Sequence, residues 1–578
     1  RPPQNFGGLR KLCAHLMHSH KILRIASPDK ALTDRLSREL GISRILAQIL
    51  ANRSLDTVAE AEKFLKVKLE HLLDPYLFSD MRKAVELIKR TAQNKGRVMV
   101  FGDYDVDGIT ALGLLKTTLE KMGLDVVHYL PHRIKEGYGL TKNILQIAKQ
   151  KNIKLLITVD CGTANYDQIK ELRRHNIEVI VTDHHEVARS DLSPASSIIN
   201  PKIKGSNYPY RDLAGVGVAY KLCQALSDSQ LVEDLDLVAL GTIADSVPLT
   251  GENRVIAKEG LLRLSRTKRA GLKALIENAG IQNRKFTPTF VSFILGPRIN
   301  ASGRMDSAET SLNLLLSETE EEAARLAKII ETHNRQRQKI ENKVLEEAQD
   351  LINKEVNFKE HKIIVVAKED WHQGVLGIVA SKLADRFYRP AIVISISQDL
   401  CKGSARSIKN FHLFEALKDC KEFLNTFGGH AHAAGLLITK DSIEDFKQNI
   451  NRLAHERLSL EDLLPSLDID MELGLADLNE EAILGLELLE PYGMANPEPL
   501  FYSRNLKMKG QPLTLSRETL KFWVTDGNIT YQAIGFGMSS FKDSLINADY
   551  FDLVFTPKMD NWSGESSVLL EARDIFFR

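Results

Sequence analysis

Short apolar runs alternate with helical stretches from about residue 80 onward. The stretch 81–93 has helical character, and four runs rich in β-branched residues have the length of buried strands. These runs cover residues 97–101, 126–130, 155–160 and 178–183. Because strands that alternate with helices usually pair in parallel, the pattern predicts an α/β domain with a doubly wound, mainly parallel sheet.

Acidic residues and histidines follow three of these predicted strands. The carboxyl ends of parallel strands share one edge of a sheet, so side chains placed there can meet although many residues separate them. A further aspartate lies near the end of a helix expected in the segment DLVALGTIADSVPL. The residues concerned are Asp103, Asp105, Asp107, Asp160, Asp183, His184, His185 and Asp245.

The first three of these aspartates occupy alternate positions in GDYDVDG. Alternate residues of an extended chain face the same way, so their carboxylates can converge, and they repel one another unless cations lie between them. A single acid at a strand end is often a helix cap or a turn residue. Three strands that each end in aspartate make coincidence a poor explanation.

The candidate ligands are oxygen atoms and imidazole nitrogens without thiolates, a set that suits Mn²⁺ or Mg²⁺, with histidine favouring Mn²⁺. There are enough of them for two ions that share a carboxylate, an arrangement used to activate water for phosphoryl-ester hydrolysis. The sequence therefore predicts a metal-dependent phosphoesterase.

The segment at residues 317–356 repeats apolar positions at spacings of three and four, which predicts one face of a long helix. Strands expected at 361–367 and 390–396 then indicate a second, smaller α/β domain. Its glycine-rich segments GSARS and GGHAHAAG can let the backbone approach a phosphate. Arg406 in the first, and Arg298 in GPRIN, suit a two-pronged grip on phosphate, although single glycine-rich turns are usually only turns.

Five short alternating segments after residue 500 predict a small β-barrel of the OB type. Aromatic and basic residues are interleaved along it and could offer stacking faces and phosphate contacts. Strand aromatics more often belong to a core, so their individual roles stay open at this point. The residues are Phe522, Trp523, Tyr531 and Phe536, with Arg504, Lys507, Lys509 and Lys521.

Overall charge says little about a partner, because 77 basic and 76 acidic residues give a net charge of +1 over 578 residues. The five cysteines are scattered without a C-x-x-C pair, which fits a reducing compartment rather than a disulfide framework or a structural zinc site. The start of the chain lacks the apolar core of a signal peptide, and no apolar run is long enough to span a bilayer. A cytoplasmic protein is expected.

Several motifs together resemble a known family. GDYDVDG, VDCG, TDHHE and GTIADSVPL, in this order, look like the first four motifs of the DHH phosphoesterase superfamily, and FGDYDVDGITA resembles its RecJ branch. Further segments similar to that branch are AGVGVAYKL, GPRINASGRMDSA, WHQGVLGIVASKL, KGSARSI and FGGHAHAAG. The likeness covers about residues 80–440. The opening RPPQNFGG departs from it, which is read as a shortened start.

The resemblance implies a metal-dependent exonuclease that hydrolyses single-stranded DNA, 5′ to 3′, in DNA repair and recombination. It implies a helical region at 1–79, a DHH domain at 80–310, a connecting helix at 311–355, a DHHA1 domain at 356–455 and an OB-like domain at 456–578. Single-stranded DNA is the expected partner, together with a single-strand-binding protein and a helicase, for a chain that is a monomer and binds no membrane. Two alternatives are a phosphodiesterase for short RNA or cyclic dinucleotides and an inactive single-strand-binding relative.

The expected site residues follow from the same motifs. Asp105, Asp107, Asp160, His184 and Asp245 are the first choice as ligands of two Mn²⁺ or Mg²⁺ ions, with Asp160 as the bridge. Asp103 and Asp183 would ligate or orient, and His185 would be a ligand or an acid near the leaving group. The candidate substrate-binding residues are Arg298, Asn300, Arg304, His372, Ser404, Arg406, Gly429 and His430.

Overall fold

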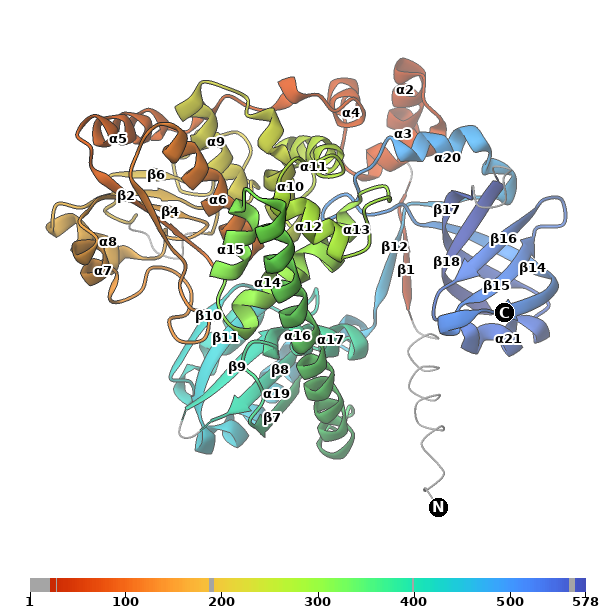
Figure 1. The fold of residues 1–578 in the computed structure, drawn as a ribbon. Coiled ribbons are helices and arrows are strands. Elements are labelled where there is room, and N and C mark those ends of the chain that lie inside the picture. The colour runs from red at the N-terminus through yellow and green to blue at the C-terminus, as the bar shows by residue number, and fades with distance from the viewer. Residues whose placement is uncertain (1–20, 28, 187–191, 398–399, 561–566, 578) are drawn as a thin grey trace. The chain divides into compact units, whose positions relative to one another are not determined.

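The structure is a computed structural model that describes residues 21–27, 29–186, 192–397, 400–560 and 567–577 (Figure 1). Its contacts divide the chain into two compact units. One unit runs from Lys68 to Leu463, and the other combines the described residues before Lys68 with those from Leu464 onward. The N-terminal Cys13 and the opening RPPQNFGG lie outside the described residues.

The larger unit begins with a five-stranded, wholly parallel sheet in the order β3-β2-β4-β5-β6. Four of these strands fall where the sequence predicts them, whereas the edge strand β6 covers only three residues and was missed. The bounds are β2 Arg97–Gly102, β3 Val126–Tyr129, β4 Ile153–Val159, β5 Glu178–Thr182 and β6 Ser197–Ile199.

Alternate residues of these strands enter two different cores, which confirms the doubly wound arrangement. Val98 and Val100 pack with α5 Met81–Gln93, α6 Val106–Lys121 and α9 Gly215–Ser227. Met99 and Phe101 point to the other face, which α7 Ile144–Gln150 and α8 Tyr166–Arg174 cover. Behind α9 lie further helices: α10 Leu235–Ala244, α11 Gly251–Leu264, α12 Ala270–Asn278, α14 Gly296–Met305 and α15 Glu309–Leu316.

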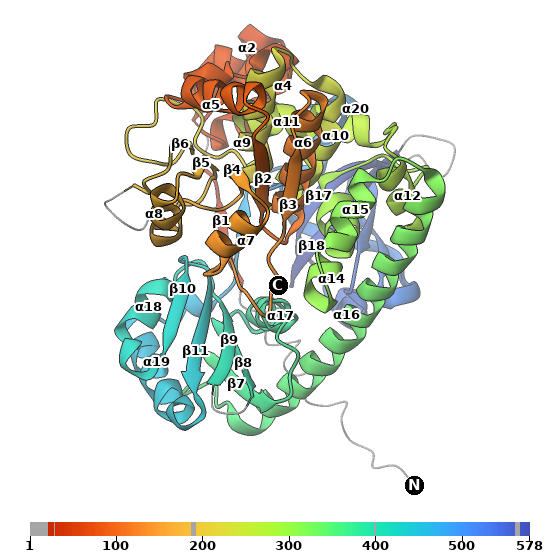
Figure 2. The ribbon, with the colours of Figure 1, turned by 60° about the vertical axis from the view of Figure 1, so that its left-hand side comes forward.

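A single helix of 36 residues, α16 Glu320–Glu355, leads from this domain to the second sheet (Figure 2). That sheet has the order β10-β11-β9-β8-β7, in which only β7 and β8 are parallel. One face packs on α16 and α17 Leu376–Phe387, and the other on α18 Leu413–Asp419 and α19 Ile443–Arg457. The strands are β7 Ile364–Glu369, β8 Ala391–Ile396, β9 Leu400–Arg406, β10 Thr426–Gly429 and β11 Ala433–Thr439.

The other unit contains a closed five-stranded barrel, because β14 pairs with both β15 and β17. This confirms the predicted OB-like fold. The strands are β14 Phe501–Thr514, β15 Leu520–Thr525, β16 Thr530–Gly535, β17 Phe551–Asp560 and β18 Ser567–Phe577.

The helices before residue 68 share a hydrophobic core with this barrel and with α20 Glu480–Glu487. Leu46 and Leu50 are among the buried side chains of that core. The bounds are α2 Lys30–Leu40, α3 Arg44–Asn52 and α4 Val58–Leu65, and the nearby strand β1 Ile22–Ile25 pairs in parallel with β12 Ser466–Ile469. Among the described residues, no helix combines the length and apolar character that crossing a membrane requires.

Candidate metal centre

The aspartate-rich motif forms the turn between β2 and α6. The strand ends at Gly102, and Asp105 caps the helix by accepting the N–H of Gly108 at 3.2 Å. Asp107 lies in the first helical turn. The carboxylates therefore converge through a strand-to-helix turn, and the expectation of one extended segment was wrong. The side chain of Asn300 supports the turn by accepting the N–H of Val106 at 3.1 Å.

Asp107 is held by the N-terminus of α9. Its two carboxylate oxygens accept the N–H groups of Gly215 at 2.6 Å and Val216 at 2.7 Å. Burial, and then the charge of Asp105, raise the pKa of Asp107 to about 7 against the opposing effect of these two hydrogen bonds. The sequence predicted Asp107 as a metal ligand, but it did not indicate that the N-terminus of α9 would bind this carboxylate.

Asp160 follows β4 directly and is buried. It has a φ of +59°, a left-handed conformation that aspartate tolerates better than most residues and that often marks functional positions. Its N–H donates to the carbonyl of Thr182 at 3.0 Å, so the neighbouring strand holds the turn.

Asp183 orients the two histidines that follow it. Its Oδ1 accepts the N–H groups of His184 and His185 and also lies 2.8 Å from Nδ1 of His185, while Oδ2 accepts the N–H of Thr163 at 2.9 Å. Burial alone would raise the pKa of Asp183, but hydrogen bonding with His185 and its charge lower it overall. The contacts thus fit the orienting role among the two expected for Asp183.

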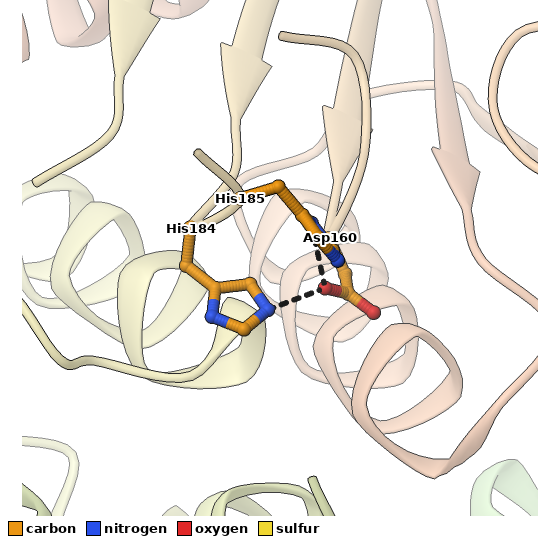
Figure 3. A group of neighbouring side chains, drawn as sticks. All are labelled: Asp160, His184 and His185. Atoms are coloured by element: carbon orange, nitrogen blue, oxygen red, sulfur yellow. Dashed lines mark ion pairs between the residues drawn. The ribbon is translucent and has the colours of Figure 1, made fainter. Parts of the chain in front are cut away.

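Seven of the eight predicted ligand residues come together in three overlapping groups, each with potential ligand atoms within 4.8 Å of one another. Nε2 of His184 lies 3.1 Å from Oδ1 of Asp160, which is also 3.9 Å from Nδ1 of His185 (Figure 3). Asp160 and His184 each belong to two groups. The groups are Asp160, His184 and His185; Asp107, His184 and Asp245; and Asp103, Asp105 and Asp160.

The electrostatics of this cluster fit a bound cation. Burial, followed by repulsion between neighbouring carboxylates, raises the pKa values of Asp103, Asp160 and Asp245 well above their usual range. Oδ1 of Asp103 and Oδ1 of Asp160 are buried and have no hydrogen-bond partner among the described residues. Buried oxygens without partners are costly, and a divalent ion would compensate both them and the repulsion.

A cluster of arginines lies next to the carboxylates. Arg304 is partly buried, and burial, together with the nearby charges of Arg133, Arg337 and Arg406, lowers its pKa to about 9. Nη1 of Arg304 donates to the carbonyl of Gly374 at 2.9 Å, which links the two α/β domains. The guanidinium of Arg133 lies 4.7 Å from the centre of the Tyr104 ring. Like charges this close indicate a site for an anion.

Most other predicted substrate residues line the second domain. Ser404 and Arg406 occupy alternate positions of β9, and both border Gly377 near the start of α17. The ring of His430 lies 6.5 Å from that of His185, with an angle of 19° between their planes. Gly429 adopts a φ of +141° in the preceding position.

The predicted substrate-binding residues His372 and Arg298 both contact neighbouring groups of the protein. Nδ1 of His372 accepts the N–H of Gly374 at 3.1 Å. Arg298 forms an ion pair with Glu331 at 2.9 Å and donates to the carbonyl of Ile294 at 2.8 Å. Its expected phosphate contact stays a prediction.

Several residues near the centre were missed from sequence. Tyr138 donates to the carbonyl of Asp160 at 3.1 Å, and its hydroxyl lies 3.0 Å from Nδ1 of His185. Asn200 donates to the carbonyl of His185 at 3.0 Å and to Thr163 at 3.1 Å. Tyr138 and Arg133 lie in the loop HRIKEGYGL, whose basic and glycine-rich composition was the available signal.

Comparison with known proteins identifies three domains. The DHH family N-terminal domain matches residues 97–242, the DHHA1 domain matches 360–456 and the RecJ OB domain matches 469–574. The single-stranded-DNA-specific exonuclease RecJ of Bacillus subtilis is 37% identical over 553 residues, covering 95% of this chain and 70% of that protein. The RecJ of Haemophilus influenzae is 32% identical over 550 residues, covering 91% of this chain and 95% of that protein.

Solved structures give the same result. The crystal structure of Thermus thermophilus RecJ in complex with Mn²⁺ matches with a TM-score of 0.83 and 28% identity, over 96% of this chain and 80% of that one. The corresponding structure with Mg²⁺ matches with a TM-score of 0.76 and 28% identity, over 96% of this chain and 78% of that one. With relatives above 30% identity across most of its length, this chain belongs to the RecJ family.

Proposed function

We propose that this protein is a metal-dependent exonuclease that hydrolyses the phosphodiester bonds of single-stranded DNA, starting at an end. One observation carries the proposal: the turns after three parallel strands and the end of α10 bring carboxylates and histidines together beside an arginine cluster. Metal ligands next to an anion site suit the cleavage of a phosphate ester. The substrate class comes from the bacterial relatives, which are named single-stranded-DNA-specific exonucleases.

We further propose that the centre holds two Mn²⁺ or Mg²⁺ ions with Asp160 between them. Support comes from the overlapping groups, since Asp160 contributes to the group with both histidines and to the group with Asp103 and Asp105. Asp107, His184 and Asp245 form the third group. Divalent ions in such a centre supply Lewis acidity and offset negative charge on the phosphate.

The side chains of this chain would bind and orient the substrate. Arg304 and Arg406 can donate paired hydrogen bonds to phosphate oxygens, and Arg133 adds positive charge nearby. Asp183 holds His185 through Nδ1, which leaves Nε2 directed elsewhere as a ligand or as an acid close to the leaving oxygen. His430 approaches the same ring from the second α/β domain.

An exonuclease needs a contact that distinguishes a strand terminus from the interior. A terminal phosphate carries more negative charge than an internal one, so a cluster of cations binds it preferentially. Arg133 and Arg406 meet this requirement with Arg304, because the charge of each is near enough to lower the pKa of Arg304. We assign the terminal phosphate to this cluster, and the 5′-to-3′ direction rests on the family resemblance alone.

The barrel offers a second surface for the strand. Phe522 is wholly buried, whereas Trp523 is 44% exposed and Phe536 is 65% exposed. Trp523 pairs in register with Lys509 on the adjacent strand, which places a base-stacking ring beside a cation. Exposed aromatics beside cations suit single-strand binding. A single-strand-binding protein, a helicase, the monomeric state and roles in repair and recombination stay predictions.

A substrate comparison tests this function. Equal concentrations of a single-stranded DNA oligonucleotide, its duplex, the RNA of the same sequence and a cyclic dinucleotide are incubated with Mn²⁺, and EDTA serves as the control. The single-stranded DNA is expected to be cleaved fastest, with no cleavage in EDTA. Faster hydrolysis of the RNA or the cyclic dinucleotide would overturn the proposal. Cleavage that continues in the presence of EDTA would also overturn it.

A further inference from the structure

Asp107 and Asp160 come from different strands and meet at the first residue of α9. The N–H of this residue, Gly215, donates to Oδ2 of Asp107 at 2.6 Å. On its other side Gly215 faces Asp160. A Cβ atom added to Gly215 would lie 2.6 Å from Cβ, 2.7 Å from Oδ1 and 2.8 Å from Cγ of Asp160. One residue thus touches two ligand carboxylates at once.

Backbone conformation does not account for glycine at this position. Gly215 is the first residue of a regular helix and is not one of the glycines with a positive φ. Glycine inside a helix is less favourable than alanine by about 0.5–1 kcal/mol. The space taken by the Asp160 carboxylate is the remaining reason that a side chain is excluded.

The three atoms nearest to a methyl group at residue 215 all belong to the Asp160 side chain. The nearest is Cβ, which rotation within the side chain does not move, so relieving the overlap requires the turn that carries Asp160 to shift together with its carboxylate. A substitution at Gly215 should therefore affect the metal centre before it affects the fold.

A second glycine borders the same carboxylate pair from another helix. A Cβ atom added to Gly241 of α10 would overlap Oγ1 of Thr110 most closely, and it would lie 2.8 Å from Cγ1 of Val216 and 3.2 Å from Oδ1 of Asp107. Val216 is the residue whose N–H donates to that oxygen. Glycine at residue 241 thus lets α10 lie close to Thr110, to Val216 and to the Asp107 carboxylate.

We propose that Gly215 is a positioning residue that sets the separation of the Asp107 and Asp160 carboxylates, and that Gly241 supports it. The inference rests on the proposed metal-dependent function. It predicts that a single methyl group at residue 215 weakens binding of divalent ions without unfolding the protein.

Gly215→Ala tests this, with Gly217→Ala as its matched control in the same helix. The three atoms nearest to a Cβ atom at Gly217 belong to the side chain of Leu213, at 3.2 Å or more. Calorimetric titration with Mn²⁺ should show affinity reduced by about 10- to 100-fold for Gly215→Ala, a range typical of residues that orient ligands. Gly217→Ala should bind Mn²⁺ as the unsubstituted protein does.

A second measurement determines the thermal unfolding temperature in the absence of metal ions. Gly215→Ala is compared in the unsubstituted protein and in Asp160→Gly, which lacks the three atoms nearest to the new methyl group. Any destabilisation by Gly215→Ala should disappear in Asp160→Gly. Equal destabilisation in both backgrounds would overturn the proposed contact, and so would unchanged Mn²⁺ affinity in a folded Gly215→Ala. If the unsubstituted protein binds no Mn²⁺, the proposed function itself fails.

Discussion

At the scale of single residues, the metal centre depends on backbone groups as much as on carboxylates. Asp107 is held by two N–H groups of α9, and Asp183 accepts backbone N–H groups from Thr163, His184 and His185. These contacts fix the carboxylates before any ion binds, so less ordering remains to be done on binding. Fixed backbone donors explain how so many acids are kept in one buried place.

The arginine cluster gives the first prediction. Arg133→Ala and Arg406→Ala should slow degradation of 5′-phosphorylated DNA by about 10-fold or more relative to 5′-hydroxyl DNA, because a charged hydrogen bond contributes about 1.5–3 kcal/mol. Arg325→Ala, an exposed arginine of α16, is the control. The readout is the ratio of the two initial rates. A ratio equal to that of the unsubstituted protein would show that the terminal phosphate binds elsewhere.

At the scale of elements, the sequence predicted those parts that periodicity encodes. The helix at 81–93 and four strands of the parallel sheet agree with the structure because apolar residues repeat through them. Ser197–Ile199 was missed because three residues are too few to show a period. Seven of the eight predicted ligand residues converge, mainly because parallel strands end at one edge, whereas Arg133 and Tyr138 lie in a loop without any repeat.

A buried ion pair links α9 to α11, and it carries the second prediction. Lys221 and Glu252 are paired and almost wholly buried, and Glu252 also accepts the N–H of Leu73 at 2.8 Å. Lys221→Met would leave the Glu252 charge without its cation, at a cost of about 3–5 kcal/mol. A lowered thermal unfolding temperature is therefore expected.

The control for this pair is Arg452→Met, which removes an exposed ion pair with Glu456. Exposed pairs contribute about 0–1 kcal/mol, so the unfolding temperature should hardly change. Similar unfolding temperatures for Lys221→Met and Arg452→Met would show that the buried pair does not stabilise the catalytic domain.

At the scale of the whole molecule, packing joins parts of the chain that are far apart in sequence. The helices before residue 68 share their core with the barrel that follows residue 500. Helical periodicity predicted those helices but could not show what they pack against, since the partner lies more than 400 residues away. The domain limits inferred from sequence stay predictions. The shared core determines which truncations avoid exposing apolar surface.

The third prediction concerns truncation. A chain of residues 68–463 keeps the unit that contains the metal centre, and it should cleave short single strands with Mn²⁺. Its affinity for long strands should fall and lose part of its salt dependence, because the phosphate contacts of the barrel are gone. A chain ending at 455 should instead aggregate, since it exposes the apolar faces of α2, α3 and α4. Undiminished affinity of 68–463 for long DNA would remove the barrel from substrate binding.

The central claim is that the cluster around Asp160 is the metal centre that cleaves the strand. Its most direct test is Asp160→Asn, which keeps the size of the side chain but removes its charge, with the exposed Asp441→Asn as control. Mn²⁺ binding is measured by calorimetry, and cleavage of end-labelled single-stranded DNA under single-turnover conditions. Asp160→Asn should lose Mn²⁺ and slow cleavage by about 1,000-fold, equivalent to about 4 kcal/mol, while staying folded. Normal cleavage by Asp160→Asn at saturating Mn²⁺ would contradict the claim.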